Sequence, residues 1–330
     1  MQTGDIVAIP VIDSFADRDT VDKLSRANVN ISKEDWDAFE TSWDFQHHPL
    51  IRRTPRVADA FSQWEEECEN RFQSLKHNEE EINRIFIDTY GLSDELIPEV
   101  DENDVTIRKA DLKRDIKGLI SYAVGCMFGR YSLNMDGLAY AGGIWDDSKY
   151  GVFVPDNDNC IPITDEAYFE DDVVGRFAEF IRVVFGDDTI EDNLDFIAKA
   201  LGNKGNSSRE IIRNYFLNEF FKDHCAAYSV SASGKRPIYW LFDSGKQNGF
   251  KALVYMHRWN ADTIGNLRVE YLHRMQRVYE KEIARMQDVI DNSHDNREIN
   301  QATKRREKLV KQLILRSLRL RSTPYKLRGC

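Results

Sequence analysis

The pattern of apolar and polar residues predicts its clearest element within residues 234–258. Two runs of aromatic and branched aliphatic residues, 238–242 and 250–256, flank a polar loop over residues 243–249 that contains Asn-Gly. Such a pattern is typical of a β-hairpin. Neither run alternates cleanly between apolar and polar positions, so both faces should be covered. We therefore expect the hairpin to lie inside a domain rather than at its rim.

Elsewhere, spacings of three and four residues between apolar side chains predict helices. The predicted helices cover residues 56–75, 77–90, 109–128, 165–185, 189–201 and 208–221. Gly91 and Gly202 directly follow two of them and are typical C-terminal caps. Gly125 and Gly129 are four residues apart, and no Gly-Lys-Ser/Thr sequence follows them, so we expect close packing there rather than phosphate binding.

The remaining segments add four further predictions. A helix is expected from Ser32, because Trp36, Phe39 and Trp43 recur at helical spacing and both tryptophans should pack. Residues 262–290 and 297–319 are predicted to form a long helical hairpin, whose first arm would extend about 40 Å. A short edge strand is predicted over residues 4–13, and residues 137–155 should form an irregular loop with a short strand. The fold class is thus α+β and predominantly helical.

Charge is divided unevenly along the chain. The net charge is -11, but residues 235–330 carry 21 Lys+Arg against 10 Asp+Glu and so reach +11, which leaves -22 for residues 1–234. This asymmetry favours a basic face that approaches phosphate and an acidic body that faces solvent or protein. Two solvated surfaces without a partner are the alternative.

Several strings resemble the C-terminal part of the PglX family, the site-specific DNA adenine methyltransferases of BREX phage-defence systems, which are relatives of type IIG restriction-modification enzymes. The strings are SWDFQHHPL (42–50), EEINRIFIDTYGLSDEL (80–96), LISYAVGCMFGRYSL (119–133), DDVVGRFAEFIRVVFG (171–186), SREIIRNYFLNEFFKDHC (208–225) and the hairpin block. The resemblance runs from about Ile12 to the helix after Arg258. It implies duplex DNA as a partner, and other BREX proteins or the catalytic half of the enzyme as further partners.

The resemblance, together with the predicted helical hairpin and a basic C-terminal end that departs from the family's appearance, divides the chain into segments. They are residues 1–55 as a connector or the end of a catalytic region, 56–133 as a helical spacer, 134–260 as a mixed α+β target-recognition region, 261–320 as the helical hairpin and 321–330 as a disordered basic tail.

The motifs that such a methyltransferase uses for catalysis are absent from this sequence. The family binds S-adenosylmethionine with a Gly-rich loop and holds adenine with an Asn-Pro-Pro-Tyr type tetrapeptide, yet no two glycines here are separated by a single residue and all eight prolines are isolated. We expect that the chain alone does not methylate DNA and needs no cofactor. In the family these motifs lie upstream, so we expect Met1 to begin a fragment, a split gene or a truncated form.

The candidate DNA-binding residues are the basic side chains around the hairpin and on the last helix. They are Lys235, Arg236, Lys246, Lys251, Arg258, Lys304, Arg305 and Arg306. Arginine suits bidentate contacts with guanine or phosphate, and lysine supplies charge. The alternative for each is solvated surface around a buried hairpin. A module that binds other proteins, with little DNA contact, is the alternative for the whole chain.

Metal and membrane functions have little support in the sequence. The five cysteines are scattered, and the histidine pairs such as His47-His48 lack further ligands at metal-binding spacing, so no metal site is predicted. The Glu99, Asp111 and Lys113 combination is only a distant match to a nuclease centre, since Asp111 and Lys113 fall in a predicted helix. The longest apolar window, residues 119–128, is too short to cross a bilayer, and a cytoplasmic location is expected.

Overall fold

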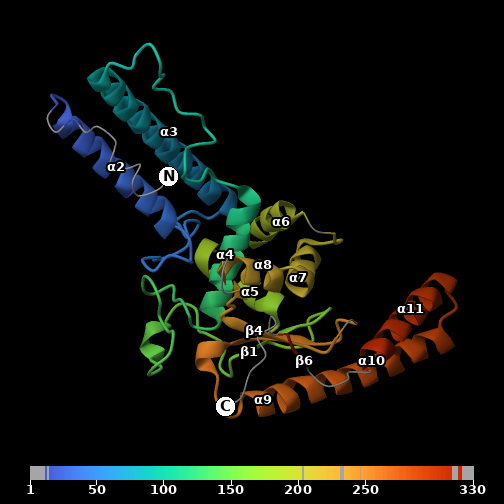
Figure 1. The fold of residues 1–330 in the computed structure, drawn as a ribbon. Helices are drawn as coiled ribbons and strands as arrows, with labels where there is room; N and C mark the ends of the chain where they lie inside the picture. Colours follow the sequence, from blue (N-terminus) through green and yellow to red (C-terminus); the bar gives the residue numbers. More distant parts are fainter. Residues whose placement is uncertain are drawn as a thin grey trace.

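The computed structural model describes residues 12, 15–202, 204–230, 234–245, 247–313 and 319–321. A central body of helices and a small sheet lies between two projecting helical arms (Figure 1). One arm contains α2 and α3, near the N-terminus, and the other contains α10 and α11. This arrangement confirms the predicted fold class. The predicted strand at residues 4–13 lies almost wholly outside the described residues.

The first arm pairs α2 (Arg18–Asp37) with α3 (Val57–Tyr90). The sequence predicted two helices where α3 is one, because polar residues near position 76 suggested a break. No glycine or proline interrupts residues 57–90, so those polar side chains simply face solvent. Gly91 ends α3 in the left-handed conformation with φ 67°, as predicted.

The predicted packing of Trp36 and Trp43 is wrong. The helix contains Ser32 in its interior and ends at Asp37, so Trp43 is not on the same helical stripe as Trp36. Trp36 is 50% exposed and Trp43 is fully exposed. Two aromatic side chains are therefore presented to solvent near the base of this arm.

Five helices build the central body. They are α4 (Leu112–Met127), α5 (Val173–Phe185), α6 (Ile190–Leu201), α7 (Ser208–Asn218) and α8 (Phe220–Ala227). Asp172 caps α5 and sets its start eight residues later than predicted, and Glu219 separates α7 from α8. Gly125 lets the ring of Tyr131 approach so closely that a Cβ would lie 2.4 Å from it, which supports the packing role predicted there. In residues 137–155 the regular element is a 3₁₀ turn, η1 (Asp147–Lys149), rather than the expected strand.

The predicted hairpin forms the centre of an antiparallel sheet. Strands β4 (Tyr239–Asp243) and β5 (Lys251–Tyr255) pair with Leu241 opposite Leu253, and the strand order is β1, β5, β4, β6. The outer strands are β1 (Cys160–Ile163) and β6 (Arg319–Arg321). Strands β2 (Ser229–Val230) and β3 (Gly234–Lys235) form a separate short ribbon. The hairpin is thus interior, as predicted.

Alternate residues of the hairpin face two different cores. Leu253 and Tyr255 belong to the main core, which also contains buried residues of α3 to α8, whereas Ala252 and Val254 pack against the second arm. The second arm comprises η2 (Met256–Arg258), α9 (Thr263–Asn266), a π-helical turn η3 (Leu267–Leu272), α10 (His273–Asn292) and α11 (Asn296–Leu313). The predicted helical hairpin is present; the described part of α11 reaches Leu313, and residues 319–321 form β6 rather than its predicted end. The tail at 322–330 lies outside the described residues.

The main core contains residues from Phe45 to Tyr255, and therefore draws on several of the predicted segments. The segment boundaries remain a prediction. Within the described ranges, no helix is long and apolar enough to cross a membrane.

Candidate nucleic-acid interface and acidic cluster

Two of the predicted DNA-binding residues are engaged inside the protein. Lys251 is only 6% exposed, and its ammonium group donates to the Leu217 carbonyl at 2.6 Å and lies 3.9 Å from Asp243. Arg258 is half-buried and donates to three main-chain carbonyls, the shortest at 2.7 Å on Asp156. Its guanidinium also lies 4.3 Å from the centroid of the Trp145 ring. These contacts correct the prediction of surface positions for both residues, since burial cannot be inferred from charge alone.

The other predicted residues are spread over separate places. Arg305 forms ion pairs with Asp165 at 2.9 Å and Glu166 at 2.7 Å, which join α11 to the acidic part of the chain. Arg236 and Lys304 are exposed, and Arg306 is half-buried. Only the backbone of Lys235 is described, and Lys246 lies outside the described residues. Among the described side chains of the predicted set, Lys251, Arg258 and Arg305 are engaged within the protein, and DNA contact by the exposed Arg236 and Lys304 remains a prediction.

A basic row that the sequence analysis missed lies on the exposed side of α10. It consists of Arg274, Arg277, Lys281 and Arg285, all exposed and separated by three or four residues. We call this set the α10 basic ridge. This spacing places the four side chains on one helical face over about 16 Å. The sequence prediction chose α11 because three of its basic residues are adjacent. The ridge would instead have been found from basic residues repeated at helical spacing.

Most of the ridge is not neutralised locally. Arg285 pairs with Glu282 at 2.8 Å, and the guanidinium of Arg274 lies 5.3 Å from the Phe169 ring centroid. Among the described residues, no carboxylate lies within 4.0 Å of the charged groups of Arg274, Arg277 or Lys281. The charge of Arg274 also interacts with the carboxylate of Asp171. The ridge can therefore offer Arg277 and Lys281, and Arg274 in part, to an external polyanion.

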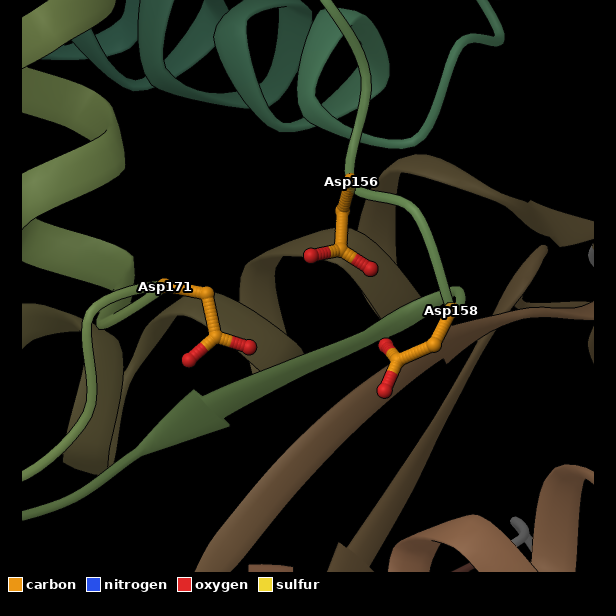
Figure 2. Close-up of side chains that lie close together, drawn as sticks. All are labelled: Asp156, Asp158 and Asp171. Atoms are coloured by element: carbon orange, nitrogen blue, oxygen red, sulfur yellow. The ribbon is translucent and has the colours of Figure 1, made fainter. Parts of the chain in front are cut away.

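A second feature outside the sequence predictions is a group of three carboxylates. Asp156 and Asp158 precede β1, and Asp171 precedes α5 (Figure 2). One oxygen atom from each lies within 4.8 Å of the others. The hydroxyl of Tyr271, in η3, lies 2.6 Å from Asp171 and 2.9 Å from Asp158. The cluster thus links the base of the second arm to the central body.

The electrostatics of this cluster favour a retained proton. Burial, together with the nearby Asp158 carboxylate, raises the pKa of Asp156 to about 7, and burial also raises the pKa of Asp171. Three carboxylate oxygens could instead hold a hard divalent cation such as Mg²⁺ or Ca²⁺. The Asp-x-Asp spacing was visible in the sequence, but only folding brings Asp171 to it.

Replacing Asp156 with asparagine is expected to stabilise the protein at alkaline pH. The raised folded-state pKa means that this group's stabilising contribution is complete below about pH 4 and is lost as the pH rises through 7. The advantage of Asp156→Asn should therefore grow over that range and reach roughly 2–4 kcal/mol at pH 8. Urea unfolding in chelator at several pH values measures it, with Glu170→Gln, at an exposed position, as the control. An advantage that does not change with pH would contradict the assignment.

Comparison with known proteins identifies the class. No family model matches the chain. It is 45% identical over 319 residues to the adenine-specific methyltransferase PglX of Lacticaseibacillus casei (strain Zhang), and 34% identical over 339 residues to the adenine-specific methyltransferase BrxX of Escherichia coli O9:H4 (strain HS). Each match covers 94% of this chain, which spans 26% and 27% of the two relatives. The chain is therefore related to adenine-specific methyltransferases.

Within that class the relationship is specific. The chain corresponds to a C-terminal portion of the PglX/BrxX group, and this confirms the resemblance found in the sequence strings.

Proposed function

We propose that this chain contacts duplex DNA as the target-recognition portion of a BREX-type adenine-specific methyltransferase. The α10 basic ridge is the observation that carries this proposal. Cations that neutralise phosphates release condensed counterions, which supplies much of the affinity of a protein for DNA. The ridge lies on an arm that projects from the body, where a long polyanion has access to it (Figure 1). The relationship to two adenine-specific methyltransferases supports DNA as the polyanion.

In this proposal the chain holds DNA and other parts of the enzyme perform the chemistry. A Gly-rich cofactor loop and a Pro-Pro tetrapeptide are both missing from the sequence. Binding S-adenosylmethionine and transferring its methyl group are therefore assigned to the remainder of the full-length enzyme. Extrusion of the target adenine costs a few kcal/mol, which extensive contacts with the DNA backbone help to offset.

Neutralising the ridge is expected to weaken DNA binding. The triple variant Arg274→Ala, Arg277→Ala and Lys281→Ala removes three cations, so the slope of log K against log salt should become shallower by about 2 to 3 for duplex DNA. At low salt the Kd should rise about 10- to 100-fold. Fluorescence anisotropy with a labelled duplex, measured across a salt series, tests both expectations.

A matched variant separates the ridge from a general effect of net charge. Arg182→Ala, Lys199→Ala and Lys222→Ala removes the same charge from exposed positions of the central body and should leave the slope nearly unchanged. Equal losses in the two triple variants would show that the ridge has no special part in binding.

The competing function is a module that binds protein rather than DNA. It is favoured by apolar side chains near the outer end of the first arm, where Leu96 is 52% and Ile97 is 77% exposed. Such residues are suited to contact with another part of the methyltransferase. DNA binding that is absent or insensitive to salt, together with intact binding of the separate catalytic part, would favour this function.

A further inference from the structure

A cavity of about 740 Å³, lined by apolar and aromatic side chains together with arginines, lies beside the base of the first arm. Its walls come from the segment after α2, the turn after α4 and the region of β2 and β3. The lining residues used below are Trp36, Glu40, Trp43, Arg108, Arg130 and Arg236. Three arginines thus border one cavity, and Arg236 is the only one of them that the sequence analysis selected.

Arg130 is a buried cation without a nearby counterion. Its side chain is only 8% exposed and lies among tyrosines, with a long contact of 3.5 Å to the Tyr255 hydroxyl and a side-chain hydrogen bond with Tyr131. The buried Nε has no hydrogen-bond partner. In the part of the chain that the structure describes, no carboxylate lies within 4.0 Å of the guanidinium. A guanidinium has five N–H donors, and a buried charge that meets only neutral hydroxyl groups and leaves its Nε without an acceptor is costly.

Glu40 is the acidic residue that lines the same cavity. Its carboxylate accepts a hydrogen bond from the Ser121 hydroxyl at 2.6 Å and so is directed elsewhere. Burial raises the pKa of Glu40, although Ser121 and Arg130 oppose that change. Glu40 therefore offsets the charge of Arg130 only at a distance, and the N–H groups remain available to an anion.

The rim of the cavity has flat apolar surfaces next to further positive charge. Trp43 is fully exposed and Trp36 is half-exposed. The guanidinium of Arg108 lies 5.9 Å from the Trp36 ring centroid, which places a cation beside one aromatic face. Exposed aromatic rings combined with arginine are suited to stack on a nucleobase while holding its phosphate.

A neighbouring cavity extends this space. It has a volume of about 630 Å³ and shares Glu40, Phe45 and Arg108 with the first. Much of its wall is apolar surface, from side chains such as Phe39 and Phe220, although charged residues such as Lys113 and Asp223 also line it. A ligand whose anionic group reaches Arg130 would therefore find apolar space on one side and tryptophan on the other.

We infer that this cavity binds a phosphate-bearing ligand of the nucleotide class, with Arg130 as the phosphate anchor. The inference concerns residues other than the α10 basic ridge and does not depend on the proposed function. The phosphate group can belong to a free nucleotide or to an unpaired nucleic-acid strand, since both present the same oxygen atoms and a stackable base. Arg130→Met should remove the anchor, because methionine occupies similar space without charge.

Titration of the 330-residue chain tests the inference. The probes are AMP, adenosine, inorganic phosphate and a short single-stranded oligonucleotide, followed by calorimetry and tryptophan fluorescence. AMP or the oligonucleotide should bind saturably and more tightly than adenosine or phosphate alone. Arg130→Met should weaken that binding at least about tenfold, as expected for a lost charge-assisted contact. Binding of AMP alone would assign the site to free nucleotides, and binding of the oligonucleotide alone would assign it to a nucleic-acid strand.

Two further variants keep the test decisive if Arg130→Met does not fold. Glu40→Gln should tighten binding, because it removes the competing negative charge, and Arg236→Ala should weaken it from an exposed position. Arg182→Met, on the exposed side of α5, is the control for loss of an arginine and should bind as the unaltered chain does. Failure of every phosphate probe to bind, or equal binding by Arg130→Met, would overturn the inference. Neither result would alter the expectation for the ridge, because salt-dependent duplex binding is measured separately.

Discussion

Replacing Asp172 with alanine is expected to lower the free energy of unfolding by about 4–6 kcal/mol. Asp172 is 2% exposed and caps α5 by accepting hydrogen bonds from the backbone N–H groups of Val174 and Gly175. Both of its carboxylate oxygens also bind the guanidinium of Arg213, at 2.6 and 2.8 Å. Loss of a cap costs about 1 kcal/mol, and removal of one partner from a buried ion pair costs about 3–5 kcal/mol.

Urea unfolding monitored by circular dichroism measures this loss, and two variants divide it. Asp172→Asn keeps an acceptor for the cap but removes the charge, so it should lose only the contribution of the ion pair. The double variant Asp172→Ala with Arg213→Met removes both charges and should recover part of the loss. A decrease below about 1 kcal/mol in Asp172→Ala would show that the pair is not a principal link between α5 and α7.

Acid is expected to destabilise the fold through two buried histidines. Burial lowers the pKa of His48 and of His224 to about 3, from an ordinary value of 6.5. A lowered folded-state pKa means that the stabilising contribution is complete above pH 6.5 and is lost as the pH falls towards 3. Each shift corresponds to roughly 5 kcal/mol at its upper limit. Both imidazoles accept backbone hydrogen bonds, His48 from Leu50 and His224 from Ile238, which requires the neutral ring.

Asp156 acts in the opposite direction over part of this range, so the histidine contribution is clearest in the Asp156→Asn background. There, His224→Gln should flatten the dependence of unfolding free energy on pH between 6.5 and 4, since glutamine supplies an acceptor that does not titrate. Urea unfolding at successive pH values gives the slope, and His77→Gln at an exposed position of α3 is the matched control. An unchanged slope in His224→Gln would show that protonation of His224 does not contribute to the loss of stability in acid.

Local sequence predicted those parts of the fold that depend on neighbouring residues. The β4–β5 hairpin was predicted because branched and aromatic residues flank a turn, and Gly91 marked the end of α3 by its backbone freedom. The prediction that Trp36 and Trp43 pack on one helical face is wrong because the helix ends at Asp37, although the helical spacing of apolar residues continues in the sequence to Trp43. Periodicity alone does not show where a helix stops.

The candidate sites were less accessible to sequence reasoning because they depend on burial and on distant pairs. Lys251 and Arg258 have the same charge as solvent-exposed residues, and only their hydrogen bonds to carbonyl groups show that they are structural. Asp171 and Asp158 are separated in the sequence, and only the folded loop before α5 places their carboxylates close together in space. Arg130 follows a strongly apolar helix, and nothing in its neighbours reveals that it lacks an ion pair.

The long helix α3 has unequal support along its length. Its first turns belong to the main core through Phe61 and Trp64, whereas Phe72 and Leu75 belong to a small separate cluster with Val105 and Ile107. Local opening costs less where few apolar contacts must be broken. Rising temperature or denaturant should therefore fray the arm from Tyr90 inward while the body remains intact, so one continuous helix melts in two stages.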